Sequence, residues 1–526
     1  MTRHGVLIIK IIVSIWIGLF VASCGQPVGP DFAIVSGSEN QPLEPLVQEF
    51  CKQKSANCSF TYEGSLDIGL SLRPGHELNA DAVWPASDIW VNMFDTARRV
   101  SGLQSISQNP VILGVRKAKA EELGWTKKTV SMRDILAAVE SGKLRFLMTS
   151  ATQSNSGASA YLAMLSAALG KQDVLTQDDL KNAKVDEVGK LLKGVERSSG
   201  SSGWLADLFV QSADKGVIYD AMWNYEAVIK EANEKLRRQN HEVMYAIYPL
   251  EGVAVANSPI GFVERGRGPE VKVFFEALRT YLLTPEIQAR IALTGRRVPV
   301  ANAGQAPAEA DWNFDPGRLV TSVPLPEPKV IQSALNLYQE SLRRPSLTAM
   351  CLDFSGSMGG DGESQLRRSM EFLLTPERAA EVLVQWSAHD HIFIIPFNSG
   401  VEATWSGTGL AQDQSDLLTR LNDVHADGGT NMYACVEAAL NEMKPLLAAG
   451  DYLPAIVIMT DGRSEGNAGP FIDGSAFESQ RVPIFGITFG DADKSQLDKL
   501  TAATGGRVFD GTKDLVGAFR AARGYN

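Results

Sequence analysis

Short apolar runs alternate with helical patterns along residues 31–300. Runs with the length of buried strands lie at 32–35, 111–115, 146–148 and 253–256. Stretches with helical periodicity lie at 132–140, 158–169 and 271–283. Alternation of strands with helices predicts an α/β fold with largely parallel sheets.

Residues 346–526 repeat this pattern. Strands are predicted at 347–352, 392–397, 455–459, 483–488 and 507–509. Helices are predicted at 376–387, 432–447, 494–504 and 513–523. Five strands with helices between them predict a doubly wound, Rossmann-like sheet.

The segment 301–345 separates these two regions. Five prolines lie between residues 307 and 328, which predicts a stiff and irregular connection. Residues 330–343 are amphipathic at helical spacing, and Pro345 ends that helix. We therefore expect a linker with a helix over 301–345 and a separate domain over 346–526.

The N-terminus has the pattern of an export signal. Arg3, His4 and Lys10 precede an apolar run at 11–21, about half the ~20 residues that a membrane-spanning helix needs. The run ends in Val-Ala-Ser-Cys24, which resembles the bacterial lipobox. The resemblance implies a signal peptide over 1–23, a lipid anchor on Cys24 and a tether over 24–30. An ordinary signal peptide and an uncleaved anchor are the alternatives. Each cleaved form predicts an exported chain, and the lipoprotein is anchored on the periplasmic or extracellular face of the cell membrane.

Charged residues are distributed unevenly along the 526 residues of the chain. Lys and Arg number 50 against 61 Asp and Glu, a net charge of −11, which argues against binding nucleic acid through phosphate contacts. Residues 1–345 contain 37 of each sign, so the whole acidic excess, 24 against 13, lies in 346–526. Such a field concentrates divalent cations and favours a partner with basic surroundings.

Five cysteines are too few for a disulfide scaffold, although an exported chain permits disulfides. Cys51 and Cys58 are close in sequence, and we predict that they form one. Cys351 and Cys435 lie in apolar surroundings. For these two we favour buried free thiols slightly over a disulfide.

Three polar loops stand out after residue 346. Asp353-Phe-Ser355-Gly-Ser357 follows the first predicted strand, Thr430 precedes a helix, and Asp461 follows the strand 455–459. Loops at the carboxyl ends of parallel strands meet at one edge of the sheet. The donors are all oxygens, which predicts Mg²⁺, with Mn²⁺ and Ca²⁺ as alternatives. Ser357 and Thr430 could instead cap helix starts.

Together these loops resemble the metal-ion-dependent adhesion site (MIDAS) of the von Willebrand factor type A (VWA) family, over about 346–526. The resemblance implies a metal site with an open position that a protein partner's carboxylate can fill. It implies binding and not catalysis, and the catalytic sequence motifs of hydrolases, zinc proteases and P-loop enzymes are not found. The residues that it assigns to the metal are Asp353, Ser355, Ser357, Thr430 and Asp461.

Two hydroxyl-rich loops in the N-terminal region precede helices. One follows the strand 32–35, and the other, 149–156, contains five Ser or Thr side chains. Helix N-termini present free N–H groups that bind anions, whereas capping alone explains one hydroxyl per helix.

These loops, with Trp84–Asp88, residues 219–225 and a helix at 285–294, resemble the two-lobed bacterial solute-binding proteins of type 2. The resemblance covers about 31–300 and is closest to the group that takes phosphate, molybdate or sulfate. It implies two lobes around a cleft, with the chain crossing near 109–110 and 248–252, and a small anionic solute. The pocket residues that it implies are Ser36, Ser38, Ser150 and Thr152, with Asp88, Trp223 and Tyr225 as further candidates.

The function predicted is that of a membrane-anchored binding or scaffolding lipoprotein. It binds a protein partner through Mg²⁺, coupled to oxyanion binding in the N-terminal cleft. The alternative is a substrate-binding component of an ABC-type transporter that delivers an oxyanion, with the VWA domain as its docking module.

Overall fold

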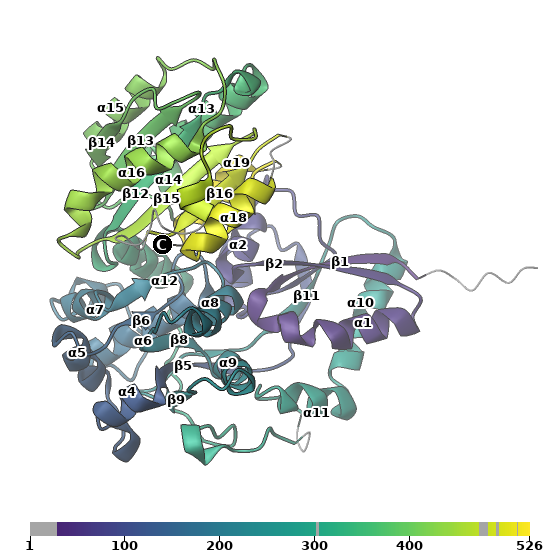
Figure 1. The fold of residues 1–526 in the computed structure, drawn as a ribbon. Helices are drawn as coiled ribbons and strands as arrows, with labels where there is room; N and C mark the ends of the chain where they lie inside the picture. Colours follow the sequence, from purple (N-terminus) through teal and green to yellow (C-terminus); the bar gives the residue numbers. More distant parts are fainter. Residues whose placement is uncertain (1–28, 301–303, 473–481, 491–493, 513, 526) are drawn as a thin grey trace, which may run out of the picture.

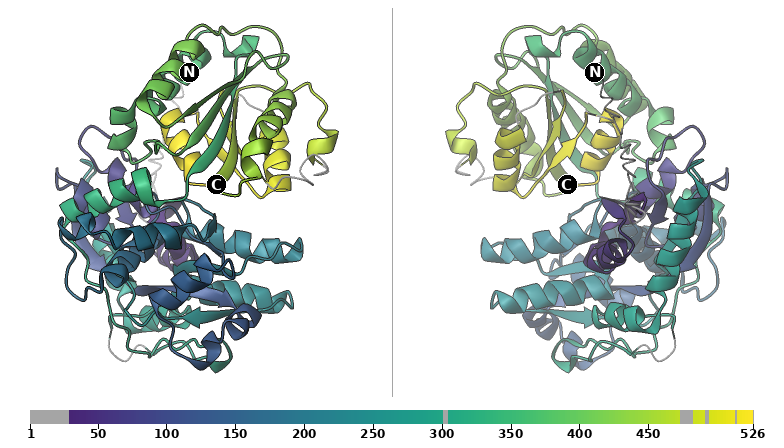
Figure 2. Two further views of the ribbon diagram at one scale, coloured as in Figure 1. Left: turned by 90° about the vertical axis from the view of Figure 1, so that its left-hand side faces the viewer. Right: turned by 90° about the vertical axis from the view of Figure 1, so that its right-hand side faces the viewer.

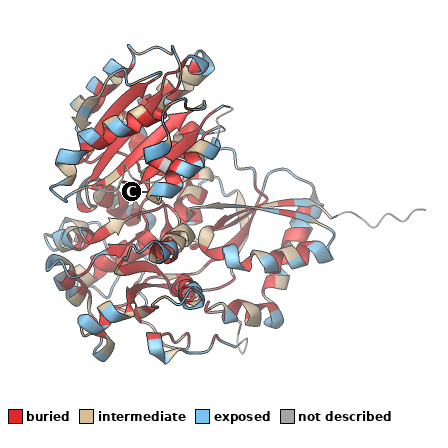
Figure 3. Cartoon of the chain, viewed as in Figure 1, coloured by how far each residue is buried: buried red, intermediate tan, exposed pale blue. Residues whose placement is uncertain are grey.

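The computed structural model describes residues 29–300, 304–472, 482–490, 494–512 and 514–525. The predicted signal peptide, Cys24 and the first part of the tether lie outside the described residues. Three α/β units are present, and the third lies over the first two (Figures 1 and 2). The central strands of the sheets are buried and the outer faces of the helices are exposed (Figure 3), as the alternating pattern predicted. In the described parts of the chain, no helix is both long and apolar enough to span a membrane.

The first lobe is a five-stranded sheet in the order β2-β1-β3-β11-β4. β1 pairs in parallel with β2 and β3, whereas β11 is antiparallel to β3 and β4. Helices α1 (Glu44–Gln53) and α10 (Pro269–Leu282) pack on it through Val47, Phe50 and Phe275. The strands are β1 (Asp31–Gly37), β2 (Asn57–Glu63), β3 (Ala82–Trp84), β4 (Val100–Ser105) and β11 (Pro259–Val263).

The second lobe is a six-stranded sheet in the order β10-β5-β8-β6-β7, with β9 also paired to β5. Its strands are β5 (Asn109–Arg116), β6 (Phe146–Leu147), β7 (Val195–Arg197), β8 (Ala221–Tyr225), β9 (Met244–Ile247) and β10 (Val255–Ala256). Its main helices are α5 (Met132–Glu140), α6 (Asn155–Leu169), α7 (Val185–Leu192), α8 (Ser202–Asp214) and α9 (Glu226–Arg238). Twelve of the fifteen residues of α6 are buried, because the helix runs through the core of this lobe.

The chain enters the second lobe between β4 and β5, next to the predicted crossing at 109–110. It returns between β10 and β11, at residues 257–258, and the prediction of 248–252 was wrong. The reason is that Val255 and Ala256 pair with Pro110 and Asn109 of β5, which keeps residues up to 256 on the second lobe.

The segment 301–345 packs on the second lobe along most of its described length. Trp312 and Phe314 are buried and stack with ring centroids 4.7 Å apart. Helix α12 (Pro328–Leu337) continues into one π-helical turn, η5 (Tyr338–Leu342). Ile331 and Leu335 of α12 belong to the same hydrophobic core as the second lobe. The segment predicted as a linker is therefore an extension of that lobe.

The third domain is a six-stranded sheet in the order β14-β13-β12-β15-β16-β17, parallel except for β14. Helices cover both faces (Figure 1), and one hydrophobic core lies on each face. Its strands are β12 (Ser346–Asp353), β13 (His391–Phe397), β14 (Trp405–Thr408), β15 (Leu453–Thr460), β16 (Ile484–Thr488) and β17 (Val508–Asp510). Its main helices are α13 (Asp361–Leu373), α15 (Ala411–Leu421), α16 (Met432–Leu447), α18 (Lys494–Thr504) and α19 (Leu515–Arg523).

The structure confirms the doubly wound fold but differs from the prediction in several elements. Helices α13 and α15 lie where no helix was predicted. β14 is a short antiparallel edge strand that is only partly buried, so it leaves no apolar run in the sequence. The helix predicted over 376–387 ends earlier, as α14 (Pro376–Glu381), because Leu383 adopts a left-handed backbone with φ of 59°.

Four cysteines form two close pairs in the fold. The disulfide between Cys51 and Cys58 is present and joins α1 to β2. The expectation of free thiols at Cys351 and Cys435 was wrong, because these residues also form a disulfide. Helix α16 packs directly on β12, which brings the two Cα atoms to 5.9 Å across a sequence separation of 84.

Candidate metal and solute sites

Asp353 ends the central strand β12 and is fully buried. Its Oδ1 accepts a hydrogen bond from the Ser355 backbone N–H at 2.8 Å. Its Oδ2 accepts one from the hydroxyl of Thr460, which ends the neighbouring strand β15. The carboxylate is therefore held from two strands at the carboxyl edge of the sheet.

The loop after β12 contacts the loop after β15 directly. The Ser355 hydroxyl lies 3.1 Å from the Ser357 hydroxyl. Ser357 in turn donates to Oδ1 of Asp461 at 2.8 Å. Ser355 is buried, Ser357 is exposed and Asp461 is half-buried, so this edge opens to solvent.

Thr430 approaches the same edge from the loop before α16. A Cβ built on Gly462 would lie 3.1 Å from the Thr430 hydroxyl and 3.7 Å from the Ser357 hydroxyl, so Gly462 packs closely between these two loops. The N-cap of α16 is Asn431, which accepts from the Ala434 N–H at 3.2 Å. Thr430 thus does not cap this helix, and its hydroxyl lies beside the Asp353 and Asp461 loops.

Burial raises the pKa of Asp353, and the nearby Asp461 carboxylate adds to the rise, while hydrogen bonds from Thr460 and Ser355 oppose it. Burial also raises the pKa of Asp461, and the hydrogen bond from Ser357 opposes that rise. Two partly desolvated carboxylates with hydroxyls around them form an all-oxygen donor set, which suits a hard divalent cation. The described residues include no cluster of three or more His, Cys, Asp or Glu arranged for a metal.

The four hydroxyls predicted for the solute pocket do not converge. Ser36 is buried inside the first lobe, where its hydroxyl donates to the Trp84 carbonyl at 3.2 Å. Ser38 faces the second lobe and accepts from the Ser201 hydroxyl at 2.9 Å and the Gly203 N–H at 3.2 Å. The lobes are therefore in direct contact at this point, and the cleft is closed there.

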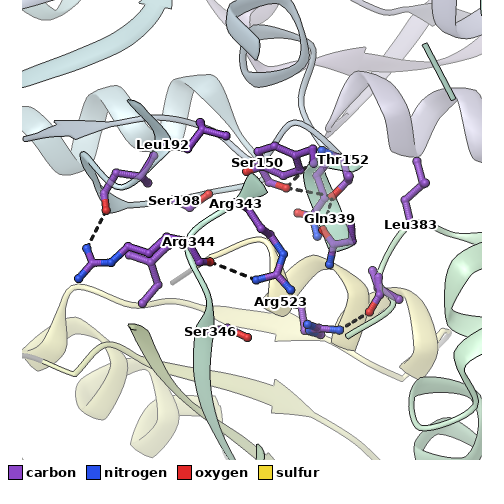
Figure 4. Close-up of a pocket in the computed structure, with 15 residues that line it drawn as sticks. Ser150, Thr152, Leu192, Ser198, Gln339, Arg343, Arg344, Ser346, Leu383 and Arg523 are labelled. Carbon is purple, nitrogen blue, oxygen red and sulfur yellow. Dashed lines mark hydrogen bonds between the residues drawn. The ribbon is translucent and has the colours of Figure 1, made fainter. Parts of the chain in front are cut away.

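Ser150 and Thr152 lie on a different side of the second lobe. Their hydroxyls are 3.1 Å apart in the loop between β6 and α6. Both line a cavity that also includes Arg343 and Arg523 but neither Ser36 nor Ser38 (Figure 4). Of the further candidates, Asp88 is half-buried and its backbone N–H donates to Oδ1 of Asn257, and Trp223 is a core side chain.

Two charged side chains at the closed cleft, Glu39 and Arg296, were not predicted from the sequence. Glu39 is 4% exposed, and burial raises its pKa to about 7, against the opposing effects of its own backbone N–H, Arg296 and Ser202. Arg296 is fully buried at its side chain, donates to the Glu39 carbonyl and pairs with Glu231 at 2.8 Å. Glu39 directly follows Ser38 in the sequence. It was not predicted as a site residue, because a carboxylate does not suit a pocket expected to bind an anion.

Tyr225, at the end of β8, lies near Glu39, whose charge adds to the effect of burial in raising the Tyr225 pKa. Its hydroxyl accepts from Asn155 at 3.0 Å, and Asn155 accepts from the Trp90 indole at 2.8 Å. The hydroxyl is thus committed to a buried network that links both lobes.

Comparison with known proteins identifies two family models in the chain. The model described as "Bacterial extracellular solute-binding protein" matches residues 33–297, just over half of the chain. The model of the von Willebrand factor type A domain matches residues 349–515. No curated protein matches the chain.

Solved structures with similar folds exist for both regions. The periplasmic binding protein AfuA from Actinobacillus pleuropneumoniae, with fructose-6-phosphate bound, is 13% identical, covers 60% of this chain and 98% of its own, and has a TM-score of 0.43. The periplasmic molybdate-binding protein of Azotobacter vinelandii is 12% identical, covers 51% and 100%, and has a TM-score of 0.35. A von Willebrand factor type A protein from Catenulispora acidiphila is 16% identical, covers 35% and 43%, and has a TM-score of 0.29.

Proposed function

Because the chain belongs to the bacterial extracellular solute-binding protein family and carries a C-terminal VWA domain, we propose that it is an exported protein that binds a partner protein through Mg²⁺. Solute-binding and VWA domains are binding modules, so the proposal includes no reaction. The ion would be held by Asp353, Ser355, Ser357, Thr430 and Asp461, and would offer an open position to a carboxylate of the partner.

One observation carries this proposal. Oxygen donors from three separate loops lie together at the open edge of β12 and β15, and the Ser357 hydroxyl already contacts Asp461 at 2.8 Å. Burial disfavours the charged form of both carboxylates there, and a cation would offset that cost. The acidic excess of residues 346–526 would raise the local concentration of divalent cations.

Calorimetric titration of Mg²⁺ into the full chain tests the metal site. The Asp353→Asn variant keeps the side-chain volume and one acceptor oxygen, and should give no binding heat because it removes the buried charge. The matched control is Asp361→Asn, which removes an exposed carboxylate at the start of α13 and should titrate like the unmodified protein. A normal isotherm from Asp353→Asn would place any Mg²⁺ binding elsewhere and refute the assignment.

The proposal also includes a lipid anchor on Cys24. An oxidising compartment outside the cytoplasm fits the two disulfides of the described chain. Mass spectrometry of the mature N-terminal peptide tests the anchor. An acylated Cys24 as the first residue is expected, and an unmodified N-terminus would rule the anchor out.

Delivery of a solute to a permease is a second candidate, favoured by the family match over 33–297. Phosphate, sulfate, molybdate, amino acids and sugars can be compared by thermal shift of the full chain. Stabilisation by one class would name the solute. Absence of any shift would contradict this candidate and leave the metal-dependent function unaffected.

A further inference from the structure

A cavity of about 40 Å³ lies where the second lobe, the turn η5 and the VWA domain meet (Figure 4). A single water requires roughly 10–15 Å³ on the same measure, so the space exceeds one water. It is far smaller than the roughly 300–1,000 Å³ of sites for drug-sized molecules. Its size therefore suits a small ion.

The lining of the cavity is strongly basic. Arg343 and Arg344 come from the segment between η5 and β12, and Arg523 comes from the end of α19. Among the described residues, none of those that line the cavity is Asp or Glu. Figure 4 shows Arg343 between the loop of Ser150 and Thr152 and the helix that carries Arg523.

The carboxylates around the cavity do not balance these charges. Asp390 is buried behind the lining and is shared, since it pairs with Arg343 and lies 3.7 Å from Arg523. Burial lowers the pKa of Arg523 to about 9; Asp390 opposes this and the charge of Arg343 adds to it. Glu196 and Asp451 act on Arg344 from outside the cavity. An excess of buried positive charge remains where Arg343 and Arg523 meet.

The cavity lining also contains buried hydrogen-bond donors that are unsatisfied. Nε of Arg343 and the hydroxyl of Ser346 are buried and have no hydrogen-bond partner among the described residues. Ser150 and Thr152 bring two further hydroxyls, which contact each other at 3.1 Å, and the Thr152 hydroxyl also donates to Oε1 of Gln339 at 3.5 Å. Unsatisfied buried donors destabilise a fold, and an anion with several oxygens would satisfy them.

We infer that this cavity binds a small inorganic oxyanion of the phosphate or sulfate class, held by Arg343 and Arg523 with the hydroxyls of Ser150, Thr152 and Ser346. Guanidinium groups match the oxygen spacing of such ions and bind them through charge-assisted hydrogen bonds. The site is separate from the cleft at Ser38 and from the metal site at Asp353, and it does not rest on either proposal.

The cavity lies between two domains, so an anion bound in it would contact both of them. The loop of Thr152 already contacts α19, since Arg520 donates to the Thr152 carbonyl at 2.9 Å. Arg344 donates to the Val195 carbonyl of the second lobe at 2.9 Å. An anion bound between Thr152 and Arg523 would add a further link between the solute-binding and VWA domains.

The test is a calorimetric titration of the full chain with inorganic phosphate in the presence of EDTA, with sulfate as competitor. Ser346→Ala should bind about three- to tenfold more weakly, because one hydrogen bond is lost. It should fold normally, because that hydroxyl has no hydrogen-bond partner in the described part of the chain. Arg523→Gln should weaken binding by about tenfold or more. The matched control is Ser166→Ala, which removes a buried hydroxyl that also has no partner, on α6 and outside the cavity lining.

Hydrogen exchange locates the ion. Phosphate should protect residues 338–346 and α19 in the unmodified protein. Equal affinity in Ser346→Ala and the unmodified protein, or absence of binding at millimolar phosphate, would overturn the inference. Protection confined to the lobe contact of Ser38 and Ser201 would also overturn it, and would assign the anion to the cleft.

Discussion

Replacing Asp390 with Asn should strongly destabilise the VWA domain. Asp390 directly precedes β13 and is completely buried. Its Oδ1 accepts from Nη1 of Arg343 at 2.9 Å and from the Ser346 N–H at 2.7 Å. Its Oδ2 accepts from Nη2 of Arg343 and from the Ser387 N–H at 2.8 Å. One carboxylate therefore satisfies two backbone donors and most of a guanidinium group.

The magnitude follows from what the substitution leaves behind. Asn retains one acceptor oxygen, so Arg343 and the backbone N–H of Ser387 lose their partners at Oδ2. Removing one member of a buried ion pair costs about 3–5 kcal/mol, because the remaining charge is uncompensated. The proximity of Arg523 adds to that cost, since Asp390 is the carboxylate that both arginines share.

The effect should depend on pH. Burial works to raise the pKa of Asp390, but the charges of Arg343 and Arg523 and the hydrogen bonds from Arg343 outweigh it, so this pKa lies below its usual value. An acid with a lowered pKa contributes stability above its unfolded pKa of about 3.9, and that stability is lost as the pH falls through the folded pKa. The difference between the unmodified protein and Asp390→Asn should be complete at pH 7 and shrink below about pH 4.

Hydrogen exchange of the β12 and β13 amides in increasing urea measures this domain separately from the two lobes. The control is Asp178→Asn, which breaks an exposed pair with Lys181 and should leave the profile unchanged. A loss of less than about 1 kcal/mol in the free energy of unfolding at pH 7 would refute the argument that breaking this ion pair leaves the charge of Arg343 uncompensated. A loss that stays constant on acidification would show that the charge of Asp390 does not carry the effect.

Three further predictions concern the lobes and the second disulfide. Replacing both Cys351 and Cys435 with Ala should cost about 4–5 kcal/mol, because the disulfide closes a long loop, and urea unfolding under oxidising conditions measures it. Phe314→Ala should destabilise the second lobe by about 3–5 kcal/mol, and hydrogen exchange of the β5 amides should detect this loss. No change would mean that the segment 301–345 behaves as a free linker. Glu39→Gln should gain stability over the unmodified protein as the pH rises from 4.5 to about 7, by roughly 3 kcal/mol, because the raised pKa of Glu39 makes its ionisation costly in the folded state. Thermal melts across this pH range test it, and parallel curves would contradict the burial of that carboxyl.

The parts of the structure that the sequence predicted well depend on neighbouring residues. The apolar runs of β12, β13, β15 and β16 are continuous because parallel strands are buried on both faces. Parallel strands also place their following loops at one edge, so Asp353 and Asp461 could be paired before their separation in space was known. The two-lobed fold and the VWA fold followed from the same periodicities and motifs.

The sequence did not predict correctly which hydroxyls lie together in a solute pocket. The hydroxyls of Ser38 and Ser150 precede helices in similar loops, and nothing local to them distinguishes the two. The structure turns one toward α8 and the other toward the VWA domain. That difference arises from the packing of the third domain on the second lobe, which no periodicity records.

The sequence by itself determined the class of fold, the approximate extents of the two families and the oxygen donors available for a metal. The tertiary structure alone decided the disulfide between Cys351 and Cys435, the closed contact at Ser38 and the basic cavity around Arg343. Each of these depends on groups far apart in the chain, such as the two cysteines, which are 84 positions apart, or Thr152 and Arg520, which are 368 positions apart. Hydrophobic periodicity and motifs reflect the local environment of one segment of the chain. Contacts between distant residues form only after separate sheets and helices have packed together.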